Sequence, residues 1–110
     1  MEAEQTGGVR EAFENARARL AARRPARAIE QLQAILEVRP DEVNALCLLG
    51  TLRCEQGNVK EAIALLTRAH AGAPGFHQVG LELARVLRVA DRLEEAISVL
   101  QTITARAPNL

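Results

Sequence analysis

The stretch 43–76, VNALCLLGTLRCEQGNVKEAIALLTRAHAGAPGF, decides the fold of this chain. Each half spaces its apolar residues by three and four, which is typical of an amphipathic helix. Between the halves, the sequence predicts a turn at Gly57, because glycine takes a left-handed backbone conformation at little cost. Pro74 ends the second half, since proline lacks the amide hydrogen that a continuing helix needs. The stretch therefore predicts two short helices joined as a hairpin.

The same pattern recurs in the stretches that directly precede and follow this one, 9–42 and 77–110. The recurring residues are Ala28, Ile29, Leu32 and Pro40 in the first copy, Ala62, Ile63, Leu66 and Pro74 in the middle copy, and Ala96, Ile97, Leu100 and Pro108 in the third. Three tandem copies of equal length therefore cover 9–42, 43–76 and 77–110. The remaining head, 1–8, is polar and contains two glycines, so it is expected to be disordered.

The period and the recurring residues resemble the tetratricopeptide repeat. In the middle copy the matching residues are Leu49, Gly50, Gly57, Ala62, Ala69 and Pro74. The chain departs from the family at its aromatic positions, because Phe13 and Phe76 are its only aromatic residues. The resemblance implies an all-α fold, in which six antiparallel helices stack as three helix-turn-helix pairs in a short right-handed α-solenoid.

Turn and cap residues place the helices within the copies. The expected helices are 9–22, 25–38, 42–55, 59–71, 76–90 and 92–105. Asp41, Asn58 and Asp91 are expected to cap the third, fourth and sixth of them, because their side-chain oxygens can accept from free amides at a helix start. Small residues such as Gly50 and Ala62 are expected where the two helices of a pair approach closely.

Composition limits the classes of function. The formal net charge is zero, which removes bulk attraction to nucleic acid or an anionic membrane. No apolar segment approaches the ~20 residues that span a bilayer. Cys47 and Cys54 lie on one predicted helix at a separation of roughly 10 Å, too far for a disulfide. We therefore expect a cytoplasmic protein with free thiols, and the excess of arginine over lysine is typical of a bacterial gene.

The resemblance implies that the first helix of each pair lines a concave face, with lining residues spaced by three and four. The predicted lining is Arg10, Phe13, Arg17 and Leu20 in the first copy, Asn44, Cys47, Thr51 and Cys54 in the second, and Gln78, Leu81, Arg85 and Arg88 in the third. These positions hold four arginines and no acid, and the nearest expected negative residue is Glu55 at the rim.

This lining favours a groove for a peptide segment of another protein that carries acidic residues. Arg17 and Arg85 would make bidentate contacts to its carboxylates. The alternative is that these arginines only cover a solvated helix face. Some members of the family clamp the C-terminal tail of chaperones with Lys and Asn residues. In this chain those places hold Phe13, Arg17, Leu48, Gln78 and Glu82, so a chaperone-tail adaptor is not expected.

The sequence offers no pattern for catalysis. It contains no nucleophile triad, phosphate-binding loop or dinucleotide-binding motif. Cys47 and Cys54 have too few neighbouring ligands for a metal site, and His70 and His77 are separated by the breaker Gly72-Ala73-Pro74-Gly75. We therefore expect a protein that is not an enzyme and that has no metal and no cofactor.

Three repeats are close to the minimum for a stable array, because each repeat hides its apolar side against its neighbours. Nothing is expected to cover the last repeat, so Leu87, Leu100 and Ile103 are expected to leave an apolar flank open. Three functions remain open on this basis. The chain is an interaction or scaffolding module, an accessory region of a larger bacterial enzyme such as a transferase, or a module that forms a homodimer through this flank.

Overall fold

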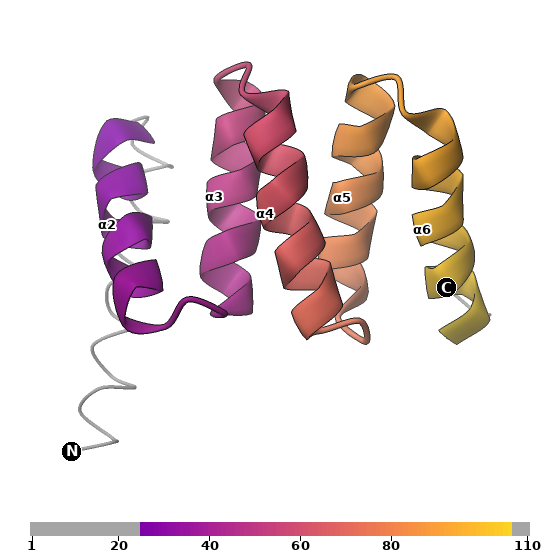
Figure 1. Ribbon diagram of the computed structural model, residues 1–110, viewed down its shortest axis with the longest axis horizontal. Helices are drawn as coiled ribbons and strands as arrows, with labels where there is room; N and C mark the ends of the chain where they lie inside the picture. Colours follow the sequence, from indigo (N-terminus) through magenta and orange to yellow (C-terminus); the bar gives the residue numbers. More distant parts are fainter. Residues whose placement is uncertain (1–24, 107–110) are drawn as a thin grey trace.

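The computed structural model describes residues 25–106, which form five α-helices and no strand. The helices are α2 (Pro25–Val38), α3 (Val43–Glu55), α4 (Val59–Gly72), α5 (His77–Val89) and α6 (Leu93–Arg106). Each begins and ends within one residue of its expected range. Consecutive helices run antiparallel and lie side by side from α2 to α6 (Figure 1). The expected first helix, 9–22, and the head, 1–8, lie outside the described residues.

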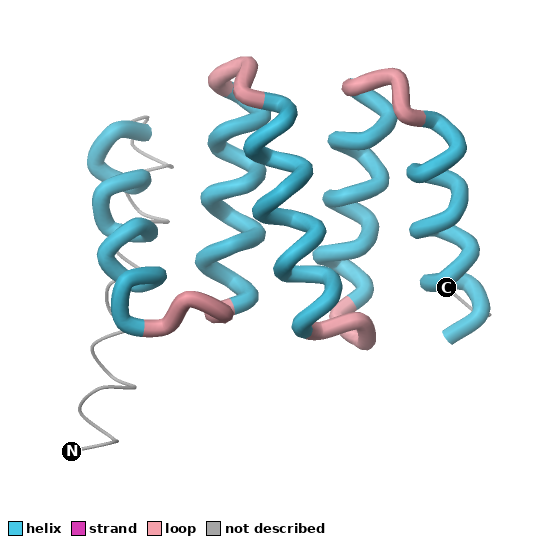
Figure 2. The backbone as a smooth tube through the Cα atoms, in the orientation of Figure 1, coloured by secondary structure: helices cyan, strands magenta, loops and turns pink. Residues whose placement is uncertain are grey.

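The helices form two layers (Figures 1 and 2). The helices α3 and α5 lie in one layer and contact each other, while α2, α4 and α6 lie in the other. The pairs α3–α4 and α5–α6 are complete hairpins, and α2 precedes them and contacts α3. The chain is therefore an all-α solenoid of stacked helical hairpins, as expected from the period of the sequence.

Apolar spacing explains which side of each helix is buried. The helix α2 buries Ala28, Ile29, Leu32 and Ile35, which lie on one face. The helix α3 contacts α2, α4 and α5, so its buried residues are spread over more than one face. These residues are Ala45, Leu46, Leu49, Gly50 and Leu52. Among the described residues no polar side chain is buried. The hairpins are therefore held together by aliphatic packing against their neighbours.

Close helix packing occurs at two glycines. A Cβ atom at Gly50 would lie 2.8 Å from Leu66 Cγ and 3.3 Å from the carbonyl oxygen of Ala62. This contact lies inside the α3–α4 pair, where small residues were expected. A Cβ atom at Gly80 would lie 2.7 Å from Ile103 Cδ1, so α5 also approaches α6 closely. Neither glycine can gain a side chain without a shift of its neighbours.

None of the three expected residues, Asp41, Asn58 and Asp91, caps its helix with a side-chain hydrogen bond. Glu42, and not Asp41, is the N-cap of α3, because the Ala45 amide donates to Glu42 Oε2 at 2.6 Å. The physical reason is register, since α3 begins at Val43 and only Glu42 directly precedes it. Asn58 precedes α4 as expected, but its side chain makes no capping hydrogen bond.

Asp91 ends α5 instead of capping α6. Its φ is 60°, in the left-handed region that Gly57 occupies with a φ of 87° at the end of α3. The amide of Arg92 donates to the Leu87 carbonyl at 2.8 Å, and the turn at Gly57 closes with an equivalent bond of 2.8 Å. Asp91 therefore takes the place of the turn glycine, which is possible because aspartate tolerates this conformation better than most side chains.

Candidate functional site

A groove of about 330 Å³ runs between α3 and α5. Its lining residues are Asn44, Cys47, Leu48, Thr51, Phe76, Gln78, Val79 and Glu82. Four residues of the predicted lining, from two different repeats, lie together here: Asn44, Cys47, Thr51 and Gln78. The groove also contains Leu48, Phe76 and Glu82, which the predicted lining did not include. Its floor and walls thus combine amides, a hydroxyl, a carboxylate and apolar side chains.

Glu82 is the acid of this groove, and the expectation that Glu55 is the nearest negative residue is wrong. Thr51 Oγ1 donates to Glu82 Oε1 at 3.3 Å, and Arg85 Nε donates to the same oxygen at 2.9 Å. Arg85 and Glu82 therefore form an ion pair. The sequence contained the signal, because position 82 follows Gln78 by four residues and so lies on the same face of α5.

The thiol of Cys47 is half-buried in the groove. Burial, and to a smaller extent the negative charge of Glu82, raise the pKa of Cys47 to about 11. The thiol is therefore neutral at ordinary pH, whereas a reactive cysteine needs a lowered pKa. In residues 25–106 no three His, Cys, Asp or Glu side chains gather closely enough to hold a metal ion. The Cys47 thiol is therefore not an activated nucleophile.

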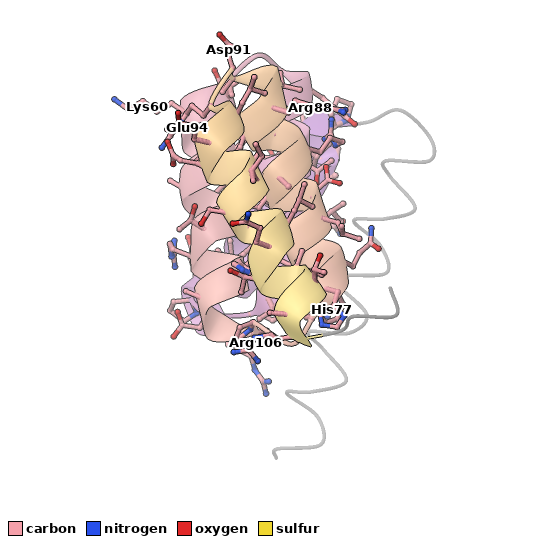
Figure 3. The ribbon with its side chains drawn as sticks, turned by 90° about the vertical axis from the view of Figure 1, so that its right-hand side faces the viewer. Lys60, His77, Arg88, Asp91, Glu94 and Arg106 are labelled. Atoms are coloured by element: carbon pink, nitrogen blue, oxygen red, sulfur yellow. The ribbon has the colours of Figure 1, made fainter. Side chains whose placement is uncertain are left out.

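A second groove of about 360 Å³ lies between α5 and α6, at the end of the stack that faces the viewer in Figure 3. It contains three residues of the predicted lining, Leu81, Arg85 and Arg88, together with Ala84, Leu93, Ala96, Ile97 and Leu100. Cys54 lines neither groove and packs partly buried against the core. The structure therefore divides the predicted residues between two grooves. Arg10, Phe13, Arg17 and Leu20 lie outside the described residues.

The two arginines of α5 differ in their surroundings. The hydrogen bond to Glu82 raises the pKa of Arg85 above its usual value and uses the Nε and Nη2 atoms of its guanidinium, which leaves Nη1 able to donate to a ligand. Arg88 forms no ion pair with any residue of the described range. Figure 3 shows Arg88 at one edge of the end face, with Glu94 at the opposite edge. On α5, Arg88 is therefore the arginine whose charge has no acidic partner within residues 25–106.

The expected apolar flank is present, but two of its three residues are not part of it. Leu87 packs in the core with α4, and Ile103 packs against Gly80, so both are buried. Only Leu100 is exposed as expected. The exposed apolar row of α6 is Leu93, Ile97 and Leu100, with exposed fractions of 50%, 53% and 41%. The side of α6 that carries Ala96 and Ile103 packs on α5, so Leu93, Ile97 and Leu100 lie on the side that faces outward.

Two family models match the chain, and both are described as Tetratricopeptide repeat. One covers residues 13–76 and the other covers residues 54–109. A search of curated protein sequences finds no match. The two models together extend over nearly the whole chain and overlap in the middle copy, which is the copy with the clearest hairpin pattern.

Three solved structures are similar to the chain. A mutant O-GlcNAc transferase from Thermobaculum terrenum matches 96% of this chain with 27% identity and a TM-score of 0.86, and the match spans 20% of that protein. MamA matches 91% of the chain with 20% identity and a TM-score of 0.81, over 58% of its own length. The second TPR of Spaghetti (RPAP3), solved with the HSP90 peptide SRMEEVD, matches 96% of the chain with 14% identity and a TM-score of 0.82, over 98% of its length.

The last two likenesses concern the fold, since their sequence identity is low. The chain spans less than two thirds of the transferase and of MamA. No helix in residues 25–106 has the length and apolar character needed to cross a membrane. Because two family models each match half of the sequence or more, and the helical hairpins stack with the same period, the chain belongs to the tetratricopeptide repeat family.

Proposed function

We propose that the α3–α5 groove binds a peptide segment of another protein, and that the chain acts as an interaction or scaffolding module without catalysis of its own. The observation that carries this proposal is the meeting of side chains from two repeats in one groove. Asn44 and Gln78 are exposed there, and each amide can both donate to and accept from an extended backbone. Leu48 and Phe76 offer apolar contacts beside them.

The charges along α5 suggest which peptide fits. Glu82 lies in the α3–α5 groove, and Arg88 lies further along α5, at a rise of roughly 9 Å, where it lines the neighbouring α5–α6 groove. An extended peptide advances about 3.3 Å per residue, so this distance corresponds to about three peptide residues. We propose a segment with an acidic side chain near Arg88 and a hydrogen-bond donor near Glu82. Arg10 and Arg17 of the first copy would add to an acidic preference.

A second candidate is that the chain is the accessory region of a larger bacterial enzyme. The likeness to the O-GlcNAc transferase supports it, because the match spans 20% of that protein at 27% identity. The same groove would then serve an enzyme whose catalytic part lies outside this chain. Homodimerisation through Leu93, Ile97 and Leu100 is a third candidate, supported by their exposure. The free thiols of Cys47 and Cys54 fit a cytoplasmic location for each.

The test starts from peptides selected for binding to the full chain from a random display library. The affinity of one selected peptide is measured by fluorescence anisotropy for the chain and for the double variant Asn44→Ala and Gln78→Ala. We expect at least about a tenfold loss of affinity, equivalent to about 1.4 kcal/mol. Lys60→Ala is the matched control, because Lys60 is exposed on α4 away from the groove. Unchanged affinity of the double variant would contradict the proposal.

The acidic preference has its own test. Arg88→Ala should weaken an acidic selected peptide and leave a neutral one unaffected. The loss should shrink at high salt, because exposed charges are screened. The peptide SRMEEVD is a useful comparison, since the Lys and Asn clamp is replaced in this chain. We expect no saturable binding of it, and tight binding would show that the clamp residues are not needed.

A further inference from the structure

The α5–α6 groove repeats a groove that the molecule itself fills one repeat earlier. The outer sides of α4 and α6 occupy equivalent positions in successive copies, so that Val59, Ala62, Ile63 and Leu66 correspond to Leu93, Ala96, Ile97 and Leu100. The four residues of α4 pack in one cluster with α5. Of the four residues of α6, only Ala96 is buried. The same aliphatic surface is thus covered by a helix in one copy and open in the next.

The helix α5 shows what fits such a surface. It buries Val79, Leu83, Val86 and Leu87, which recur at steps of four, three and one. Gly80 follows the first of these residues, and its lack of a side chain permits close packing against Ile103 of α6 and also against His70 of α4. The surface therefore accepts an amphipathic helix with large aliphatic residues at this spacing and a small residue beside the first of them.

The arginines at the rim of the open groove favour a docked helix that carries negative charge. By the same equivalence between copies, Arg85 takes the place of Thr51 and Arg88 takes the place of Cys54. In the filled groove, Glu82 of α5 lies 3.3 Å from Thr51. A helix docked one repeat later in the same way brings its own residue at the Glu82 position beside Arg85. A carboxylate at that position would form a charge-assisted hydrogen bond with the guanidinium. The fitting helix is therefore acidic on this edge.

A second copy of this chain fits the groove less well. By the same register, residues 9–22 carry Glu11, Asn15 and Arg19 at positions where α5 carries aliphatic residues. Head-to-tail docking of that segment would bury unpaired charges, which is strongly unfavourable. A two-fold pair would present the same patch from both copies, so that the rim arginines of the two molecules share one interface. Both arrangements therefore place unfavourable charges in the interface.

We propose that the α5–α6 groove docks an amphipathic α-helix of a partner protein, packed as α5 packs on α3 and α4, with a carboxylate beside Arg85. The exposed row Leu93, Ile97 and Leu100 supplies the apolar contact, and Arg88 supplies a second positive group at the rim. This site shares no lining residue with the α3–α5 groove. Its rim residue Arg88 is also the residue that we propose to meet an acidic side chain of the peptide. A chain with both sites holds a peptide on one surface and a helix at the end of its stack.

The probe is a synthetic peptide with the sequence of residues 77–89, held helical by a staple across the positions of Leu81 and Arg85. Short isolated helices are marginal in water, so the staple is needed. Binding to the full chain is measured by fluorescence anisotropy. We expect saturable binding that falls at least about tenfold with Ile97→Asp. Val38→Asp is the matched control, because Val38 is also an exposed aliphatic residue, at 67%, but lies on α2.

Three further measurements decide between outcomes. A peptide that carries Glu82→Lys should bind at least about tenfold more weakly at low salt, since it places two positive charges together. The double variant Asn44→Ala and Gln78→Ala should bind the helical peptide normally, so this proposal and the peptide groove can fail separately. The proposal is overturned if the peptide does not bind saturably, or if Ile97→Asp and Val38→Asp bind it equally. It is also overturned if the unbound chain dimerises in sedimentation and Ile97→Asp abolishes the dimer.

Discussion

Gly50 is the residue on which the packing of the α3–α4 hairpin depends most closely. Gly50→Ala places a Cβ atom within 2.8 Å of Leu66 Cγ, so the helices must move apart or Leu66 must leave its place. We expect a loss of about 1–3 kcal/mol in the free energy of unfolding. The measurement is the urea midpoint of the variant compared with that of the wild-type chain.

Gly72→Ala is the matched control for this change. Gly72 is also helical, but an added Cβ atom would meet nothing within 4 Å. We expect an unchanged or slightly raised midpoint, because alanine favours the helix over glycine. Equal midpoints for the two variants would mean that the α3–α4 contact is not close. The sequence alone predicted the small residue here, because its equivalents in the other two copies are Ala16 and Ala84.

The raised pKa of Cys47 predicts that the folded chain loses stability at alkaline pH. Its pKa is raised from 9.0 to about 11, so between these values the folded chain holds a proton that the unfolded chain has lost. The stabilising effect is complete below pH 9 and disappears as the pH rises through 11. We expect stability to fall over this range, and to fall less in Cys47→Ala. Few other side chains interfere, because the chain has no tyrosine and a single lysine, Lys60.

The rate of alkylation by iodoacetamide checks the same group directly. In a Cys54→Ala background, the pH midpoint of the rate should lie well above the ordinary range for a thiol. Glu82→Gln should lower this midpoint, since it removes the negative charge that opposes the thiolate. It should not restore an ordinary value, because burial is the larger cause. An alkylation midpoint unaffected by Glu82→Gln would place the carboxylate too far away to act.

At the scale of the helix, local sequence predicts that an acidic residue caps α3, but the first residue of the helix determines which acid does so. Asp41 and Glu42 are adjacent acids, and either could cap a helix. Glu42 does so because α3 begins at Val43. We expect Glu42→Ala to lower the free energy of unfolding by about 1 kcal/mol, since the Ala45 amide loses its acceptor. Asp41→Ala should cost clearly less, and thermal unfolding of both variants distinguishes them. The reverse order would restore Asp41 as the cap.

The helix bounds were predictable because they depend on signals within a short stretch of sequence. Apolar spacing, Pro40, Pro74 and Gly57 mark where helices begin and end. The rotation of α6 was not predictable in this way. It depends on how α6 packs on α5, which brings together residues far apart in the sequence, such as Gly80 and Ile103. Consequently the sequence indicated an apolar flank on α6, but it did not identify which residues face outward.

At the scale of the whole molecule, the candidate site shows the same division. The period brought Asn44 and Gln78 to equivalent places in successive repeats, so their meeting in one groove follows from stacking. The pairing of Glu82 with Arg85 and Thr51 depends on how closely α3 and α5 approach, which the period does not specify. Predicting charge from one helix face therefore overstated the positive character of the groove.

The open end of the stack leads to the last prediction, which compares two equivalent leucines. Leu66 and Leu100 occupy the same place in successive repeats, but their exposed fractions are 0% and 41%. Leu66→Ala should cost about 2–5 kcal/mol, because it leaves a cavity between α4 and its neighbours. Leu100→Ala should cost well under half as much, since its side chain is already in contact with water. Urea midpoints of the two variants give the comparison.

Adding a helical partner should bring the stability loss caused by Leu100→Ala closer to the loss caused by Leu66→Ala. The stapled 77–89 peptide binds only the folded chain, so it raises the stability of the wild type by an amount set by its concentration and affinity. Leu100→Ala binds the peptide less tightly and gains less, so its deficit relative to the wild type grows when the peptide is present. The deficit of Leu66→Ala should not grow, because Leu66 lies inside the stack. If the deficit of Leu100→Ala is the same with and without the peptide, the end of the stack is not the surface on which the helix docks.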